Sequence, residues 1–232
     1  AADGTIYVQA EEYEEGAYLY AVLPDGTLKW QAEIAKNAQT PMLFSDDSIL
    51  VHGNDLRRIS STGDLVWVNN GNSIARGIPA IAPDGTVLLA GSERVDGYDA
   101  NGNYLWHLSG LGIWVRTLMV FPDNVTLAWG VNLGFNISYK LRLISAAGES
   151  LRAESHGRKS QALLSDGRYL FGWDESDVPK NGKLECFYPD GTPSWVYSPG
   201  EEIQGLVVDG TDRLYTITGG VNYGGHLRLV SL

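Results

Sequence analysis

The sequence predicts an all-β fold built from about six repeated units of four antiparallel strands, on the evidence of three observations. Short runs of alternating apolar and polar residues recur through the 232 residues, as expected of half-buried strands. Turn-forming residues, including 28 Gly and 9 Pro, separate these runs, and no window has a helical period long enough to predict a helix. A turn-plus-tryptophan motif also repeats at nearly even spacing.

The repeated motif is a turn glycine followed four positions later by tryptophan. It gives the column Trp30, Trp67, Trp106 and Trp195, and one further copy places Arg152 after its glycine instead. Successive turn glycines are 37, 39, 46 and 43 residues apart, which is typical of a repeat architecture.

Alignment on the turn glycines assigns four strands to each unit. The first is apolar and precedes a turn that contains aspartate, and the second follows this turn, as in residues 5–8, 86–89 and 213–216. The third carries apolar residues seven and four positions before the turn glycine, such as Leu19 and Val22, and the fourth runs into the tryptophan. The first strands are expected at residues 41–44, 79–82, 118–121, 162–164 and 206–208. Four antiparallel strands in about 40 residues, repeated radially, are the pattern of a β-propeller blade.

No domain boundary interrupts the repeats, so residues 1–232 are predicted to form one β-propeller domain. In this alignment the first unit lacks an inner strand and the last unit lacks an outer strand. Two explanations are open: the chain is a segment of a larger propeller, or its ends meet in an unusual closure. We favour the first.

The repeat resembles the pyrroloquinoline-quinone-type (PQQ-like) propeller repeat in residues 3–8, 18–22 and 26–30, which read Asp-Gly-Thr-Ile-Tyr-Val, Tyr-Leu-Tyr-Ala-Val and Gly-Thr-Leu-Lys-Trp. The resemblance covers essentially the whole chain and implies tryptophans packed between neighbouring blades. One large aromatic side chain at a fixed offset would contribute on the order of a few kcal/mol of burial at each interface. Arg152 breaks this column, so we expect its interface to be packed differently.

The residues do not support an enzyme. The resemblance implies a possible quinoprotein enzyme, and such enzymes use a vicinal disulfide. This chain has a single cysteine, Cys186. Cys186 shares a column of small residues with Ala21 and Gly97, so it is expected to be a core thiol. Four histidines are scattered without the spacing of a catalytic triad or a metal site. We therefore predict no catalytic residue, no metal and no cofactor.

A candidate binding site lies where the chain enters the inner strands, because these entries share one mouth of a propeller channel. The positions carry hydroxyl, amide and cationic groups suited to an anionic or polar ligand. The site residues are Thr40, Arg76, Arg116, Thr117, Arg158, Lys159, Ser160 and Gln204.

The sequence favours a non-enzymatic propeller that acts as a protein-interaction or ligand-binding scaffold outside the cytoplasm, in the periplasm, at the cell surface or secreted. A protein is the favoured partner, with an anionic or carbohydrate ligand left open. A net charge of −11 argues against nucleic acid as a partner. The sequence contains no run of 18 apolar residues, so no membrane span is predicted. The alternatives are a lectin-like carbohydrate-binding propeller and a supporting fragment of a larger quinoprotein-type enzyme or sensor.

Overall fold

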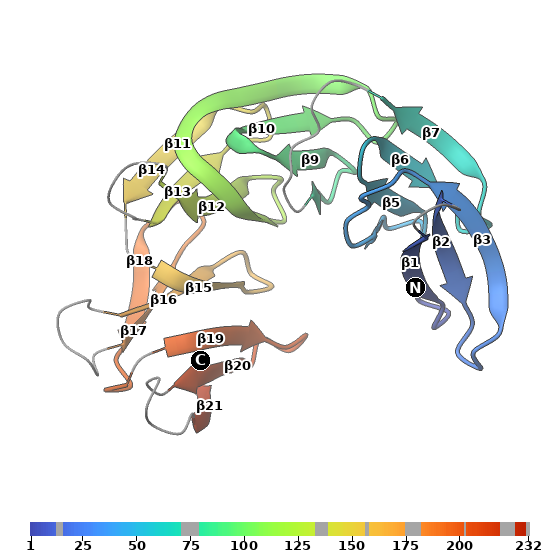
Figure 1. Cartoon of the computed structure of the whole chain (residues 1–232). Coiled ribbons are helices and arrows are strands. Elements are labelled where there is room, and N and C mark those ends of the chain that lie inside the picture. The colour runs from blue at the N-terminus through green and yellow to red at the C-terminus, as the bar shows by residue number, and fades with distance from the viewer. Residues whose placement is uncertain are drawn as a thin grey trace. The chain divides into compact units, whose positions relative to one another are not determined.

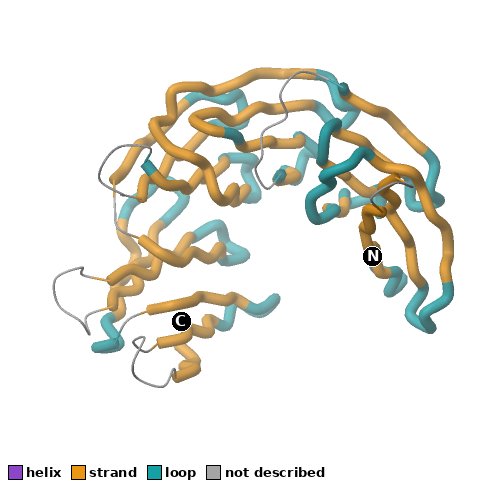
Figure 2. The backbone as a smooth tube through the Cα atoms, in the orientation of Figure 1, coloured by secondary structure: helices purple, strands orange, loops and turns teal. Residues whose placement is uncertain are grey.

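The computed structural model describes residues 1–12, 16–70, 79–132, 139–155, 158–174, 182–201, 203–218 and 226–230. Within these ranges all regular secondary structure is β-strand, joined by short loops and turns (Figure 2). The predicted all-β fold is confirmed.

The strands pair antiparallel with their neighbours in the chain, in sheets that repeat one pattern (Figure 1). We call each repeated unit a blade. Blades 1 and 2 contain β1 (Ile6–Glu12), β2 (Gly16–Val22) and β3 (Leu28–Ile34), then β4 (Met42–Leu43), β5 (Ile49–His52), β6 (Leu56–Ile59) and β7 (Leu65–Asn69). Blades 3 and 4 contain β8 (Ala80–Ile81), β9 (Val87–Ala90), β10 (Ser92–Tyr98), β11 (Tyr104–Val120), β12 (Thr126–Val131), β13 (Tyr139–Ile144) and β14 (Ser150–Ser155). Blades 5 and 6 contain β15 (Arg158–Leu163), β16 (Tyr169–Asp174), β17 (Gly182–Phe187) and β18 (Pro193–Tyr197), then β19 (Ile203–Val208), β20 (Leu214–Thr218) and β21 (His226–Val230).

One strand differs from the prediction. Residues 118–121 were expected to form a separate inner strand, but residues 118–120 end the 17-residue strand β11, which is also the outer strand of blade 3. Gly110 (φ +70°) and Gly112 (φ +63°) take backbone conformations that other residues rarely adopt, so the strand bends without ending. Blades 3 and 4 consequently share one seven-stranded sheet.

The chain divides into two compact units. The first contains Ala1–Ala128 with Leu143–Leu151, and the second contains Trp129–Arg142 with Arg152–Leu232. The division passes through β12, β13 and β14 of blade 4.

The hydrophobic core lies in the seams between consecutive blades. In the first unit, Leu19 of blade 1 packs with Ile49 and Val51 of blade 2, and Leu50 of blade 2 packs in a cluster with Leu89 of blade 3. A third cluster joins blade 3 to the residues of blade 4 that belong to this unit. In the second unit, one cluster joins blades 5 and 6 and contains Cys186, which is fully buried as its column position predicted.

In the first unit, each tryptophan of the repeated column (Trp30, Trp67 and Trp106) lies on the turn glycine of the following blade. A Cβ atom built on Gly63, Gly102 or Gly148 would come within 2.9, 2.7 or 2.4 Å of the indole of the preceding blade. The same three indoles donate hydrogen bonds to a backbone carbonyl two residues before that glycine: Trp30 Nε1 to Ser61 O (2.9 Å), Trp67 Nε1 to Ala100 O (2.9 Å) and Trp106 Nε1 to Ala146 O (3.1 Å). In the second unit, Arg152 lies on Gly191 in the corresponding way.

Candidate functional site

The residues predicted for the channel mouth fall in both units. In the first unit Thr40 is exposed just before β4, while Arg116 and Thr117 lie inside β11, not in a loop before it. Arg116 is exposed, and its guanidinium carbon lies 4.4 Å above the ring of Trp114.

In the second unit, Gln204 is exposed on β19. The backbone of Arg158, Lys159 and Ser160 begins β15, but their side chains lie outside the described part of the chain, as does all of Arg76. Convergence of the two sets of residues at one mouth stays a prediction.

A regular acidic motif marks the turn that precedes the second strand of the repeat in all six blades. The aspartate Oδ1 atom accepts a hydrogen bond from the backbone N–H two residues later, which fixes the turn. The six pairs are Asp3 with Thr5, Asp46 with Ser48, Asp84 with Thr86, Asp123 with Val125, Asp166 with Arg168 and Asp209 with Thr211.

In two of these turns the hydrogen bonds favour the charged form of the aspartate. Bonds from Thr211 are the main cause that lowers the pKa of Asp209 to about 2. Bonds from Ser48 lower the pKa of Asp46, and the charge of Arg58 lowers it further. Asp46 and Asp209 are therefore charged at neutral pH.

Two blades use this turn to hold a basic side chain from another strand. In blade 1, Lys29 Nζ lies 3.0 Å from Asp3 Oδ2 and 3.4 Å from Thr5 Oγ1. In blade 2, Arg58 donates from Nη2 to Asp46 Oδ2 (2.7 Å) and from Nε to Ser48 Oγ (2.7 Å).

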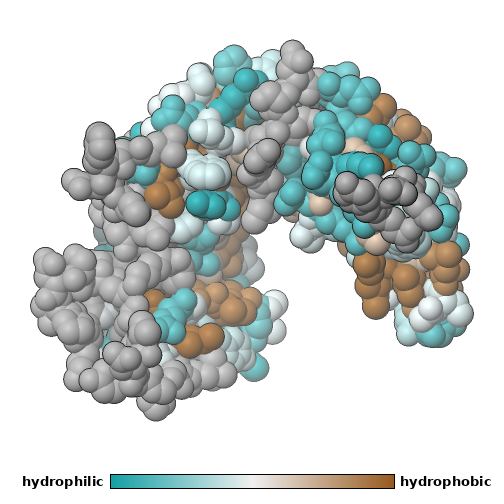
Figure 3. Space-filling view, in the orientation of Figure 1, coloured by the Kyte–Doolittle hydropathy of each residue, from teal (hydrophilic) through white to brown (hydrophobic). Residues whose placement is uncertain are grey.

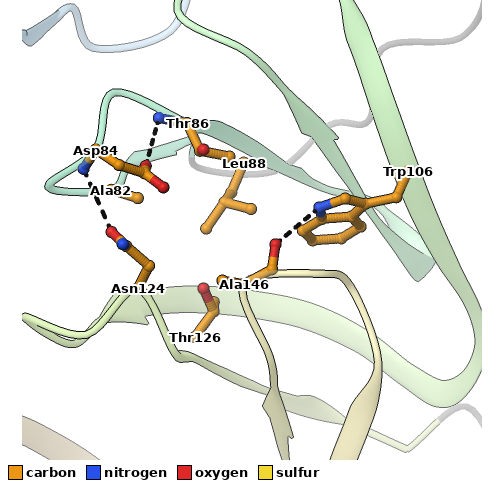
Figure 4. A pocket seen from close by; sticks show the side chains of 8 residues that line it. All are labelled: Ala82, Asp84, Thr86, Leu88, Trp106, Asn124, Thr126 and Ala146. Carbon is orange, nitrogen blue, oxygen red and sulfur yellow. Dashed lines mark hydrogen bonds between the residues drawn. The ribbon is translucent and has the colours of Figure 1, made fainter.

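The corresponding turn of blade 3 opens into a hollow at the seam with blade 4. Asp84, Thr86, Leu88 and Ala82 of blade 3 face Asn124, Thr126 and Ala146 of blade 4, and Trp106 forms one side (Figure 4). The free volume of the hollow is about 10 Å³, which is room for about one water molecule. We call it the blade 3 hollow.

Sequence reasoning missed this hollow, although its signal was present in the aligned columns. Counting back five positions from the turn glycine gives Arg58 in blade 2 and Gly97 in blade 3. The residue two positions before the aspartate is Phe44 in blade 2 and Ala82 in blade 3. Two large side chains are thus replaced by small ones at the same place.

Apolar residues gather over one face of blade 1 (Figure 3). Ile6 and Val8 are 57% and 48% exposed there. They occupy the positions of Ile49 and Val51 in blade 2, which are buried against blade 1. This face of blade 1 therefore has the composition of a blade-packing surface.

A second apolar surface is the edge strand β7, which ends the sheet β4-β5-β6-β7. Leu65, Val66 and Val68 on this strand are 57%, 53% and 40% exposed. Edge strands are commonly protected by charged residues or proline. The edge strands β3, β14 and β18 contain such residues, whereas β7 reads Leu-Val-Trp-Val-Asn and has none.

Within the described ranges, no group of three His, Cys, Asp or Glu side chains is placed to hold a metal ion. No helix in the same ranges is long and apolar enough to cross a membrane.

Comparison with known proteins identifies the fold. No protein-family model and no curated protein matches the sequence. Among solved structures, the WD40 domain of Neurospora crassa Pan2 matches with a TM-score of 0.62 at 9% identity, over 99% of this chain and 76% of that chain. A eukaryotic initiation factor matches with a TM-score of 0.58 at 12% identity, over 84% and 55%. BamB from Moraxella catarrhalis has a TM-score of 0.49 at 14% identity, over 93% and 79%.

WD40 domains are β-propellers, and the chain has the same all-β blade architecture. The predicted fold class, a β-propeller of antiparallel blades, is confirmed. At these identities the comparison identifies the fold, and a fold does not specify a function.

Proposed function

We propose that this chain is a non-enzymatic β-propeller scaffold that binds a partner protein by pairing an extended segment of the partner with β7. The observation that carries the proposal is the exposed, uncharged edge of this strand. An unpaired strand edge offers backbone N–H and C=O groups to a second chain, and exposed apolar side chains add burial on pairing.

The three exposed side chains of β7 fit such a partner. Leu65, Val66 and Val68 are all exposed on this strand, and a β-bulge at Val66, where Arg58 pairs with Trp67 and Ile59 with Leu65, interrupts the regular alternation. An added strand could bury these apolar side chains on pairing. The net charge of −11 favours a segment with basic residues, because opposite charge speeds association.

The PQQ-like repeat type supports the finer part of the proposal: a non-catalytic branch of that family, located outside the cytoplasm. A lectin-like function has less support. Trp114 is 40% exposed beside Arg116, but a lectin propeller would be expected to repeat one exposed aromatic set in every blade, and the loops differ from blade to blade.

The test compares the wild-type chain with Val66→Lys/Val68→Lys and a matched control, Val196→Lys. Val196 is 57% exposed and occupies the place of Val68 on the outer strand of blade 5. Each chain is used to capture partners from the source organism. A captured protein is then titrated against all three chains, with hydrogen exchange to map protected amides.

The proposal expects a partner that protects the amides of β7, binds the control like wild type, and loses at least about tenfold in affinity with the double variant. Equal binding to the double variant, or protection that excludes β7, would show that this edge is not the binding surface. Circular dichroism of each variant checks that the propeller is folded.

A further inference from the structure

Blade 1 has one face that carries the same kind of residues as the packed faces of blades 2 and 3 but is exposed (Figure 3). In blade 2, the residues that pack against blade 1 are Ile49, Val51 and Ile59, each at most 1% exposed. Counted from the two turns, Ile6, Val8 and Val22 take these places in blade 1. Ile6 pairs with Val22 across the strands, and Ile6 and Val8 are 57% and 48% exposed.

Blade 3 repeats the buried pattern. The same three places hold Val87, Leu89 and Tyr98, which are 0%, 1% and 8% exposed and pack in a cluster with Leu50 and Leu56 of blade 2. In both blades, therefore, apolar residues at these places are covered by the preceding blade. Blade 1 has residues of the same chemistry without such cover in the described ranges.

The second turn of blade 1 is open as well. Gly26 has a φ of +86° and donates its N–H to the carbonyl three residues earlier, as Gly63 and Gly102 do with φ +94° and +79°. Those two glycines lie under the indole of the preceding blade, whereas nothing lies within 4 Å of a Cβ built on Gly26. The carbonyl two residues before each covered glycine accepts an indole N–H. Pro24 supplies this carbonyl in blade 1, and within the described ranges no indole donates to it.

The tryptophans of the repeated column already have other places. Trp30, Trp67 and Trp106 lie on the turn glycines of blades 2, 3 and 4. Trp195 packs against the core cluster that joins blades 5 and 6. An indole for the Gly26 turn therefore has to come from outside this column.

We propose that this surface, the open face of blade 1 formed by Ile6, Val8, Val22 and the Gly26 turn, binds a β-blade of a partner polypeptide. A tryptophan of the partner lies on Gly26 and donates its indole N–H to the Pro24 carbonyl, as Trp30 does to the Ser61 carbonyl in the next seam. The partner's apolar side chains cover Ile6 and Val8. The inference concerns a surface separate from β7 and does not depend on the binding mode proposed there.

The seams of the first unit define what the partner blade must carry. The hairpin that covers blade 2 has Leu19 seven positions before its turn glycine and Trp30 four positions after it, and both pack in the seam. The hairpin that covers blade 3 repeats this spacing with Leu56 and Trp67. We therefore expect the partner hairpin to have an aliphatic residue, a glycine seven positions later and a tryptophan four positions after the glycine.

A tryptophan suits this turn better than an aliphatic side chain or a lipid tail. Gly26 has no Cβ, so a flat ring can approach its backbone closely. The indole combines a large apolar surface with one N–H donor for the Pro24 carbonyl. A purely apolar occupant would cover Ile6 and Val8 but would leave that acceptor without a donor, which is costly once water is excluded.

The experiment titrates the intact chain with a synthetic peptide of residues 56–69, the hairpin that covers blade 3. Binding is followed by nitrogen–proton correlation NMR, and the backbone N–H signals of Gly26 and Ile6 should shift with saturation. The matched control peptide has Trp67→Ala and the same charge. It should bind at least about tenfold more weakly, as expected for loss of a central tryptophan from an interface.

Variants of the chain place the contact. Gly26→Ala puts a methyl group where the indole should lie, so both probes of the site should bind at least about tenfold more weakly. Gly200→Ala is its control, because Gly200 has a φ of +75° and likewise nothing within 4 Å of an added Cβ. Ile6→Lys/Val8→Lys should also abolish binding, whereas Val196→Lys, at a residue as exposed as Ile6, should not. Circular dichroism checks that each variant is folded.

The second probe is 3-methylindole, the tryptophan side chain as a free molecule, which needs no folding in order to bind. A saturable shift of the Gly26 signal that Gly26→Ala weakens supports the proposal with either probe. The proposal is overturned if neither probe gives such a shift, or if Gly26→Ala leaves the binding of both unchanged. Peptide protection confined to β7 would overturn it and leave the β7 proposal standing. Sedimentation tests the remaining occupant: a dimer that Ile6→Lys/Val8→Lys dissociates would assign this face to a second copy of the chain instead.

Discussion

The substitution Gly102→Ala tests whether contact between an indole and the next turn glycine stabilises a seam. Gly102 has a φ of +79°, and an added Cβ would lie 2.7 Å from Cε3 of Trp67. The new methyl group therefore meets two costs, backbone strain and overlap with the indole. Gly26→Ala is a matched control, because Gly26 has a φ of +86° and no atom within 4 Å of its added Cβ.

The two costs can be estimated separately. An alanine in the left-handed region costs about 1–2 kcal/mol, which is the whole expected loss for Gly26→Ala. Overpacking adds about 1–3 kcal/mol, so Gly102→Ala should lose about 2–5 kcal/mol in the free energy of unfolding. For a chain of this length the additional loss corresponds to a melting temperature about 2–12 °C lower than that of the control.

Urea unfolding followed by tryptophan fluorescence and by circular dichroism measures this difference, and coincident curves from the two probes would justify a two-state treatment. The loss should also follow the distance to the indole, with Gly148→Ala (2.4 Å) at least as costly as Gly63→Ala (2.9 Å). Losses equal to that of Gly26→Ala within about 0.5 kcal/mol would refute the idea that the indole contact stabilises the seam.

Three further predictions concern buried or substituted positions. His52 is 2% exposed, and burial lowers its pKa below 6.5, so below that pH the unfolded chain takes up a proton that the folded chain resists. The free energy of unfolding should fall as the pH drops from 6.5 towards the pKa of His52 in the folded chain. His52→Phe should reduce this pH dependence, as measured by urea midpoints at several pH values. If the pH dependence is unchanged in His52→Phe, other groups cause it. Cys186 is fully buried and its pKa is raised by burial, so iodoacetamide should leave it unmodified in the folded chain and label it in urea, and rapid native labelling would contradict the described packing. Arg152→Trp should stay within about 1 kcal/mol of wild type in thermal unfolding, because a tryptophan on Gly191 restores the contact of the other seams, whereas Arg152→Ala should lose about 1–2 kcal/mol; the reverse order would mean that the arginine has a separate role.

The blade pattern could be predicted from sequence because it depends on local signals. Turn glycines, the aspartate of the first turn and alternating apolar residues report on neighbours within one hairpin, and these interactions are the same in every copy. The continuity of β11 was not predictable in this way. Gly110 and Gly112 resemble a strand end, but burial of Leu111 and Ile113 in the core of this seam continues the strand through them.

The sites depend on contacts between blades, which local patterns do not report. The role of Arg58 needs the Ala100 carbonyl, 42 residues away on the next blade. The blade 3 hollow can be inferred from the sequence only once it is known that Arg58 fills the equivalent place in blade 2. The predicted channel mouth depends on how residues of both compact units are placed, and no turn or strand signal contains that information.

The direction of the indole contacts has a consequence for the order in which the chain folds. In each seam of the first unit the tryptophan comes earlier in the chain than the turn that covers it, and the hydrogen-bonded residues are 31, 33 and 40 positions apart. During synthesis each blade would therefore present its indole for about one repeat length before the next turn emerges and covers it. Nearly equal separations give nearly equal loop-closure costs, so the three seams of the first unit can close one after another in chain order, each as soon as the next turn is available.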